Sequence, residues 1–96
     1  MQAEPMCVRF VESPPCEQLV SGARDHARRI RERLAAPLSV AVIVSRADAN
    51  AVRIRVLGTL HRLSFEGRGE GQPELALRDA FDRLARAAGV AELIEA

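Results

Sequence analysis

The segment AVRIRVL, Ala51 to Leu57, has the most regular alternation of side chains in the chain and constrains the fold most. One set of alternate positions is Val52, Ile54 and Val56, and the other is Arg53, Arg55 and Leu57. Because successive side chains of a β-strand point to opposite faces of the sheet, this pattern predicts a strand with one buried face. The fold must therefore cover one side of a sheet and leave the other side in water.

Two other segments have the same two-residue period. MCVRFVE, Met6 to Glu12, and LSVAVIVSR, Leu38 to Arg46, each predict a strand. Asp48 and Asn50 lie between Leu38–Arg46 and Ala51–Leu57, and both residue types favour turns. These two strands are therefore expected to form a hairpin.

The sequence after Leu57 predicts a tight turn, a fourth strand and then a loop. Gly58-Thr59 is the expected turn into LHRLSFE, in which His61, Leu63 and Phe65 would point inward. GRGEGQ, Gly67 to Gln72, has three glycines in six residues and predicts a flexible connection. This segment lacks both the Gly-Lys-Ser/Thr sequence and the spaced glycines of a phosphate-binding loop.

Two amphipathic helices complete the predicted set of elements. The first follows Ser13-Pro14-Pro15, with Ser13 as its expected N-cap, and extends to about Ala36, before Pro37. Its apolar positions recur at helical spacing: Leu19, Ala23, Ala27, Ile30 and Leu34. The second begins at Pro73 and stops at Gly89. Its apolar face consists of Leu77, Ala80, Phe81, Leu84 and Ala88.

The order β-α-β-β-β-α predicts an α+β fold with a four-stranded mixed sheet. A right-handed crossover through the first helix makes the first two strands parallel, and hairpins make the other pairs antiparallel. Both helices then pack on one apolar face, and the opposite face stays open. The length of 96 residues predicts one domain, 1–96, whose ends at 1–5 and 90–96 we expect to be loosely ordered.

The chain has fourteen basic and thirteen acidic residues, so any electrostatic role depends on where the charges lie. At about 100° per residue, Arg24, Arg28 and Arg31 fall close together on the first helix, without an acid among them. This arginine ridge is a candidate contact for an anion. Arg29 and Arg33 lie on the other flank, where Asp25 is expected to pair with Arg29.

Other arginines have less distinctive surroundings. On the second helix, Asp79–Arg83 and Asp82–Arg86 are expected ion pairs of a solvated face. The open sheet face is expected to carry Arg9, Arg53, Arg55 and Arg62, with Glu12 and Glu66 only toward the strand ends.

Several functional classes receive no support from the sequence. Cys7 and Cys16 lack metal-site spacing and are expected to be at least half-buried thiols in a reducing compartment, and no metal or cofactor is expected. His26 and His61 are expected to be partly buried structural residues. No catalytic pair can be assembled, so the chain is not expected to be an enzyme. Without an apolar leader or an eighteen-residue apolar run, it is expected in the cytoplasm and not at a membrane.

Three segments carry a resemblance to a known family: ESPPCEQLV before an arginine-rich helix, VRIRVLGTLHRLSFEG, and ELALRDAFDRLARA. Over about residues 6–88 the chain resembles the ribosome hibernation-promoting factors, also called ribosome-associated inhibitors or sigma-54 modulation proteins, in their short form. The chain departs from many relatives in having no lysine, and it has RADAN where some relatives have a His-His-Lys-Gly-like turn.

The resemblance implies a stationary-phase or stress factor that binds the decoding channel of the small ribosomal subunit and inhibits translation. Basic residues of both helices and the adjoining strands would then contact ribosomal RNA. On matching positions the implied contacts are Arg24, Arg28, Arg31, Arg53, Arg55, Arg62, Arg83 and Arg86.

A different class of function stays open from the residues alone. Ala41, Ile43 and Leu57 would form a small apolar strip on the open sheet face, which suits a protein-interaction module or a homodimer without ribosome binding. With no Trp or Tyr, and with all three Phe residues expected inside, any RNA contact should involve phosphates and shape rather than base stacking.

Overall fold

The computed structural model describes residues 6–34 and 37–89 of the chain. The elements in order are β1 (Met6–Val11), α1 (Glu17–Leu34), β2 (Ser39–Asp48), β3 (Ala51–Leu60), β4 (Leu63–Gly71) and α2 (Pro73–Ala87). The predicted β-α-β-β-β-α order is confirmed. The expectation of loosely ordered ends concerns 1–5 and 90–96, which lie outside the described residues.

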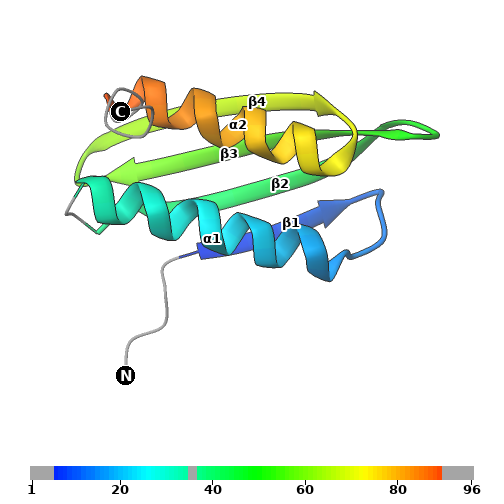
Figure 1. The fold of residues 1–96 in the computed structure, drawn as a ribbon, viewed down its shortest axis with the longest axis horizontal. Coiled ribbons are helices and arrows are strands. Elements are labelled where there is room, and N and C mark those ends of the chain that lie inside the picture. Colours follow the sequence, from blue (N-terminus) through cyan, green and yellow to red (C-terminus); the bar gives the residue numbers. More distant parts are fainter. Residues whose placement is uncertain (1–5, 35–36, 90–96) are drawn as a thin grey trace.

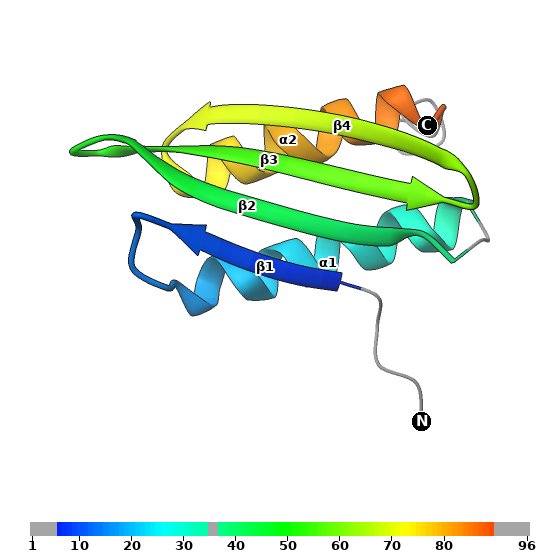
Figure 2. The same ribbon diagram turned by 180° about the vertical axis from the view of Figure 1, so that it is seen from behind.

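The four strands form one sheet in the order β1-β2-β3-β4. β1 and β2 are parallel, as the crossover through α1 requires, and the β2–β3 and β3–β4 pairs are antiparallel. Both helices lie on the same side of the sheet (Figure 1), and the view from behind shows the other side uncovered (Figure 2). The mixed sheet with one open face is therefore confirmed.

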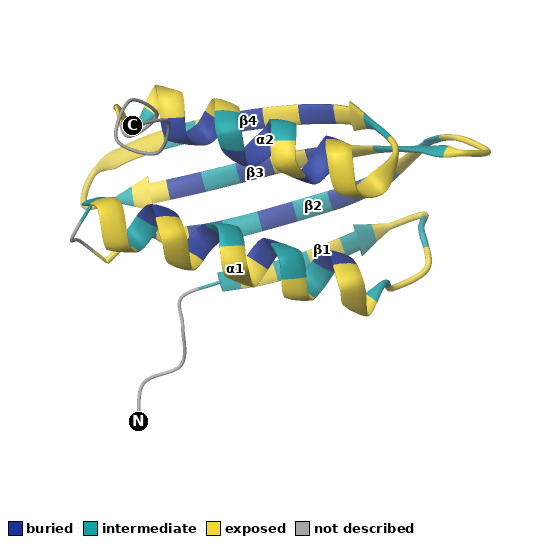
Figure 3. Cartoon of the chain, in the orientation of Figure 1, coloured by how far each residue is buried: buried dark blue, intermediate teal, exposed yellow. Residues whose placement is uncertain are grey.

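The core lies between the sheet and the helices, as the alternation of the strands predicts. Alternate positions of the two central strands are buried: Val40, Val42, Val44, Ile54 and Val56. The inner faces of both helices meet them, and Figure 3 shows the buried stripe on each helix. Phe81 on α2 is the largest fully buried side chain, at 2% exposure. The helical and strand periodicities thus identified the core correctly.

The predicted turn at Gly58-Thr59 is wrong, because β3 continues through both residues to Leu60. The turn lies at His61-Arg62, where His61 has a φ of +56° and is exposed instead of pointing inward. Leu63 is also exposed, at 61%. Gly58 is a buried strand residue, since a Cβ there would lie only 3.2 Å from Cδ1 of Leu84. Its lack of a side chain makes room for α2 instead of forming a turn.

The predicted loop at Gly67–Gln72 is also wrong, because residues up to Gly71 belong to β4. Gly67 and Gly69 are buried directly beneath α2. A Cβ at Gly67 would lie 1.9 Å from the carbonyl oxygen of Ala80, and one at Gly69 would lie 2.0 Å from that of Ala76. Only glycine allows the strand and helix backbones to approach so closely. The intervening Arg68 therefore projects from a strand onto the open face.

The start of α1 differs from the sequence prediction, and its predicted end at about Ala36 lies outside the described residues. α1 begins at Glu17, and the carbonyl of Cys16 accepts the first helical hydrogen bond, from the amide of Val20. Ser13 therefore lies too far upstream to be the N-cap. α2 begins at Pro73 as predicted, and Gly89 follows it with a φ of +78°, a conformation that glycine adopts easily.

Candidate nucleic-acid interface

Of the two helices, only α1 carries more basic than acidic residues. α1 has five arginines and three acids, whereas α2 has three of each. All of these arginines except Arg31 are exposed. The positive potential of the helical layer therefore originates mainly from α1.

The arginine ridge on α1 differs from the prediction in its charge partners. Asp25 pairs with Arg28, at 3.4 Å between Oδ1 and Nη2, instead of with Arg29. Positions three and four residues apart are both neighbours on a helix surface, so the sequence could not choose between these partners. Nε of Arg31 donates to the carbonyl oxygen of Leu38 at 2.9 Å and ties the end of α1 to the residue before β2. Arg24 has no ion pair or hydrogen bond within residues 6–34 and 37–89.

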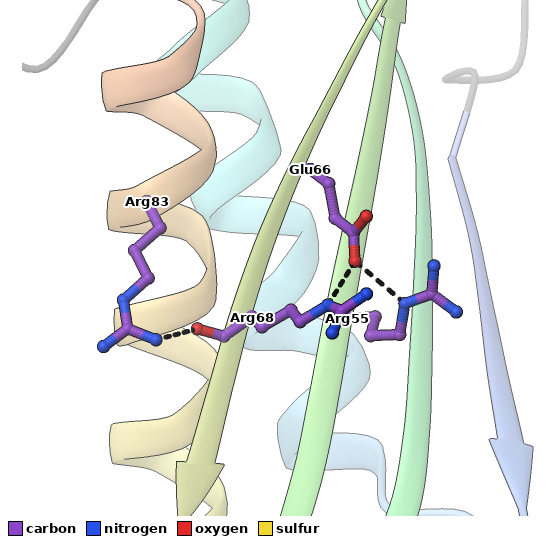
Figure 4. Close-up of polar contacts among 4 residues, drawn as sticks. All are labelled: Arg55, Glu66, Arg68 and Arg83. Carbon is purple, nitrogen blue, oxygen red and sulfur yellow. Dashed lines mark hydrogen bonds and ion pairs between the residues drawn. The ribbon is translucent and has the colours of Figure 1, made fainter.

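One of the two ion pairs expected on α2 is present. Arg86 pairs with Asp82 at 3.3 Å. Among the described residues Arg83 has no ion pair with Asp79; its Nη1 donates instead to the carbonyl oxygen of Arg68 at 2.6 Å. Figure 4 shows Arg83 reaching from α2 to β4, which is an edge strand of the sheet. Arg83 therefore binds a main-chain group at a sheet edge, where unpaired backbone groups are otherwise available to other chains.

Ion pairs between strands neutralise much of the open sheet face. Arg53 lies opposite Glu70 in the β3–β4 register, and their Nε and Oε1 atoms are 2.7 Å apart. Glu66 accepts hydrogen bonds from both Arg68 and Arg55, the latter at 3.0 Å (Figure 4). These two hydrogen bonds lower the pKa of Glu66 below its usual value. The sequence missed this network because Arg68 and Glu70 were assigned to a loop.

Two predicted arginines of the open face lie outside this network. Arg62 is in the β3–β4 turn and not on the sheet face, because β3 runs to Leu60. Arg9 is exposed on β1, opposite Ile43 of β2, and has no ion pair with any residue in the described ranges. Arg9 therefore adds one positive charge along β1 to the one that remains from the three arginines and two glutamates of the network.

The apolar strip predicted on the open face is present, with Ala41, Ile43 and Leu57 half-buried. Ala41 and Leu57 line a shallow hollow of about 530 Å³ together with Met6 and Cys7. Cys7 is exposed there and Cys16 is half-buried, so the prediction for the thiols is wrong for Cys7.

A groove between the two helices contains two arginines that are not among the RNA contacts implied by the sequence. Arg29 of α1 and Arg78 of α2 line it together with His26, Phe81 and the acid Asp82. The His26 ring stacks on Phe81 with 5.2 Å between ring centroids, and His26 is half-buried as predicted. Burial lowers the pKa of His26, and repulsion from Arg29 lowers it further. The signal for this site was present only as helical spacing, since residues 26 and 29 share one side of α1.

The residues that the structure describes include no group of three or more His, Cys, Asp or Glu side chains placed to hold a metal ion. None of the described helices is long and apolar enough to cross a membrane.

Comparison with known proteins places this architecture among solved structures. No protein-family model matches the sequence, and no curated protein matches it. The N-terminal domain of Protein Y from Thermus thermophilus is similar with a TM-score of 0.73 and 16% identity, over 90% of this chain and 93% of that one. A ribosomal subunit interface protein from Coxiella burnetii has a TM-score of 0.69 and 9% identity, over 95% and 98% of the two chains. The chain therefore has the fold of these two proteins over nearly its whole length.

Proposed function

We propose that this protein binds the small ribosomal subunit and inhibits translation by occupying the decoding channel, as a stationary-phase or stress factor of the ribosome hibernation-promoting type. The observation that carries this proposal is the match to a ribosomal subunit interface protein over 95% of this chain. The sequence resemblance supports the same family through three separate segments. Fold and sequence pattern thus favour one function, although each alone is compatible with others.

The proposed RNA contacts are the arginines identified from the sequence: Arg24, Arg28, Arg31, Arg53, Arg55, Arg62, Arg83 and Arg86. Arg24 and Arg62 are exposed and have no ion pair with a described residue, so they need no rearrangement to meet a phosphate. Arg28 and Arg53 are in exposed ion pairs, which are worth about 0–1 kcal/mol, so a phosphate group can replace their carboxylate partners at little cost.

Contacts of this protein with RNA should be made to phosphates. Phe81 is buried, Phe10 and Phe65 pack against the core, and the chain has no Trp or Tyr. No exposed aromatic platform of the kind used by single-strand binders is therefore available among the described residues. Arginine–phosphate contacts position a protein on RNA by charge and shape, which suits a factor that occupies a channel.

Co-sedimentation with purified small subunits, combined with in vitro translation, tests the proposal. We expect the wild-type protein to sediment with small subunits at low salt and to reduce translation. Arg24→Glu should weaken both effects, because it replaces an outward cation with an anion. Arg46→Glu is the matched control, since Arg46 is an exposed arginine in the β2–β3 hairpin that projects beyond the helices (Figure 1).

Absence of wild-type co-sedimentation at low salt would overturn the proposal. If the protein instead forms a concentration-dependent dimer by sedimentation equilibrium, the apolar strip of Ala41, Ile43 and Leu57 becomes the candidate surface. Equal effects of Arg24→Glu and Arg46→Glu would show that only the overall charge matters and not the helical surface.

A further inference from the structure

The groove between α1 and α2 has the dimensions and chemistry of a site for one small anionic group. Its volume is about 270 Å³, just below the range of about 300–1,000 Å³ that is typical of small-molecule sites. His26, Arg29 and Ile30 of α1 line one side, and the other side is lined by four residues of α2: Arg78, Phe81, Asp82 and Ala85. The apolar base of the groove reduces solvent screening of the charges above it.

Asp82 is an acid of the groove lining and is paired with an arginine of its own helix, whereas the two arginines of the lining have no ion pair with a described residue. Asp25 pairs with Arg28 at 3.4 Å, and Asp82 pairs with Arg86 at 3.3 Å. Each of these pairs lies within one helix, so neither acid bridges the groove. Within the described parts of the chain, Arg29 and Arg78 have no hydrogen bond or ion pair. The groove therefore presents two arginines on facing helices, and the one carboxylate in its lining, Asp82, is bonded to Arg86.

His26 lines the same groove as these two cations, and both act on its imidazole. The pKa of its imidazole is lowered by burial first and by repulsion from Arg29 and Arg78, and attraction to Asp25 opposes this only in part. Burial and the two arginines therefore favour the neutral form of the ring in the free protein. A negative group bound between the arginines would reverse the local potential and favour the protonated ring.

We propose that this groove binds one phosphodiester group of an RNA strand, with Arg29 and Arg78 as permanent cations and His26 as a third cation that takes up a proton from solvent on binding. The identity of the ligand as RNA rests on the proposed function. The stack on Phe81 holds the imidazole in place, so the groove needs no rearrangement when the phosphate enters.

Proton uptake gives the site a defined pH dependence. His26 binds its proton more tightly in the complex than in the free protein, so affinity decreases as pH rises through the interval between the two pKa values. Within that interval the affinity changes by up to about tenfold per pH unit for one proton. Binding is therefore strongest in acidified solution, where the free groove is itself partly protonated.

Proton NMR of the wild-type protein with an eight-nucleotide oligouridylate tests the proton uptake directly. The chain has only two histidines, and His61, exposed in the β3–β4 turn, serves as the internal reference. We expect saturation with the oligonucleotide to raise the titration midpoint of His26 by more than that of His61. An unchanged His26 midpoint at saturation would overturn the proposal. An equal rise with inorganic phosphate alone would overturn the RNA assignment.

Two variants separate the permanent cations from the titrating one. His26→Phe keeps an aromatic ring against Phe81 but removes the proton site, so we expect binding to lose most of its pH dependence between about pH 5.5 and 7.5, a range set by about one unit on either side of the ordinary histidine pKa. Arg78→Gln should reduce the salt slope of binding by about one, as loss of a phosphate contact does. Arg46→Gln is the matched control, and it should leave the slope unchanged. Wild-type pH dependence in His26→Phe would exclude the histidine.

The proposed function and this site can fail separately. Oligonucleotide binding with the His26 response, but without small-subunit association, would support the groove and refute the ribosomal role. Small-subunit association whose pH dependence is the same in wild type and His26→Phe would support the ribosomal role and refute the titrating groove.

Discussion

Replacing Gly67 with alanine tests the close packing of α2 on β4. A Cβ at Gly67 would lie 1.9 Å from the carbonyl oxygen of Ala80 and 2.6 Å from the amide nitrogen of Leu84. Ordinary contacts at a Cβ begin at 3.4 Å, so α2 would have to withdraw by about 1.5 Å. The obstacles are backbone atoms, so no side-chain rotation can relieve the clash.

The expected loss of stability follows from this geometry. Overpacking a core costs about 1–3 kcal/mol when side chains can adjust, and we expect Gly67→Ala to reach at least the upper value. A domain of 96 residues has a total stability of about 5–14 kcal/mol, so the loss is a large fraction. It corresponds to a decrease in Tm of about 12–24 °C. Circular dichroism at a helical wavelength is the appropriate assay, because the chain has no Trp or Tyr for fluorescence.

Gly58→Ala provides the matched control for this prediction. Gly58 also faces α2, but a Cβ there would lie 3.2 Å from a methyl group of Leu84, which is a flexible side chain. We expect Gly58→Ala to cost less than about 1.5 kcal/mol. If Gly67→Ala is no more destabilising than Gly58→Ala, the segment after Phe65 is not seated beneath α2 and the loop predicted from the sequence is correct.

Three further predictions concern the charged surfaces. Small-subunit association should weaken linearly in a log–log plot against salt concentration, and a salt-insensitive association would indicate protein contacts instead. Arg29→Glu should reduce co-sedimentation more than Arg28→Glu, because Arg29 lines the groove proposed to bind phosphate and Arg28 does not. Thermal melts should show that neither change costs more than about 0.5–1 kcal/mol, and the reverse order would favour the arginine ridge. The lowered pKa of Glu66 stabilises the fold above its ordinary value of 4.5, and this contribution is lost as pH falls through the folded-state pKa. The stability of Glu66→Gln, measured by acid denaturation, should lack that part of the pH dependence. If wild type and Glu66→Gln lose stability equally at low pH, the hydrogen bonds from Arg55 and Arg68 are contradicted.

The sequence predicted the fold more completely than it predicted the candidate surfaces. Exposure of Arg24 and Arg28 followed from helical spacing, and both arginines are on the surface. Their partners did not follow, because Asp25 is within reach of both Arg28 and Arg29 and the side-chain conformations decide the pair. The groove around His26 was missed for a stronger reason: Arg78 is fifty-two positions away, and only the packing of the helices brings it close.

What the sequence alone determined was the order of elements and the faces of the core, because both depend on local periodicity. Alternation placed Ile54 and Val56 in the core, and helical spacing placed Ala80 and Phe81 there. What only the tertiary structure decided was the role of residues whose meaning depends on a distant neighbour. Gly67 and Gly69 have the local signature of a loop, yet they are strand residues because the backbone of α2 occupies the space where side chains would be. Local propensity contains no information about that helix, so only the assembled fold can assign these glycines to a strand.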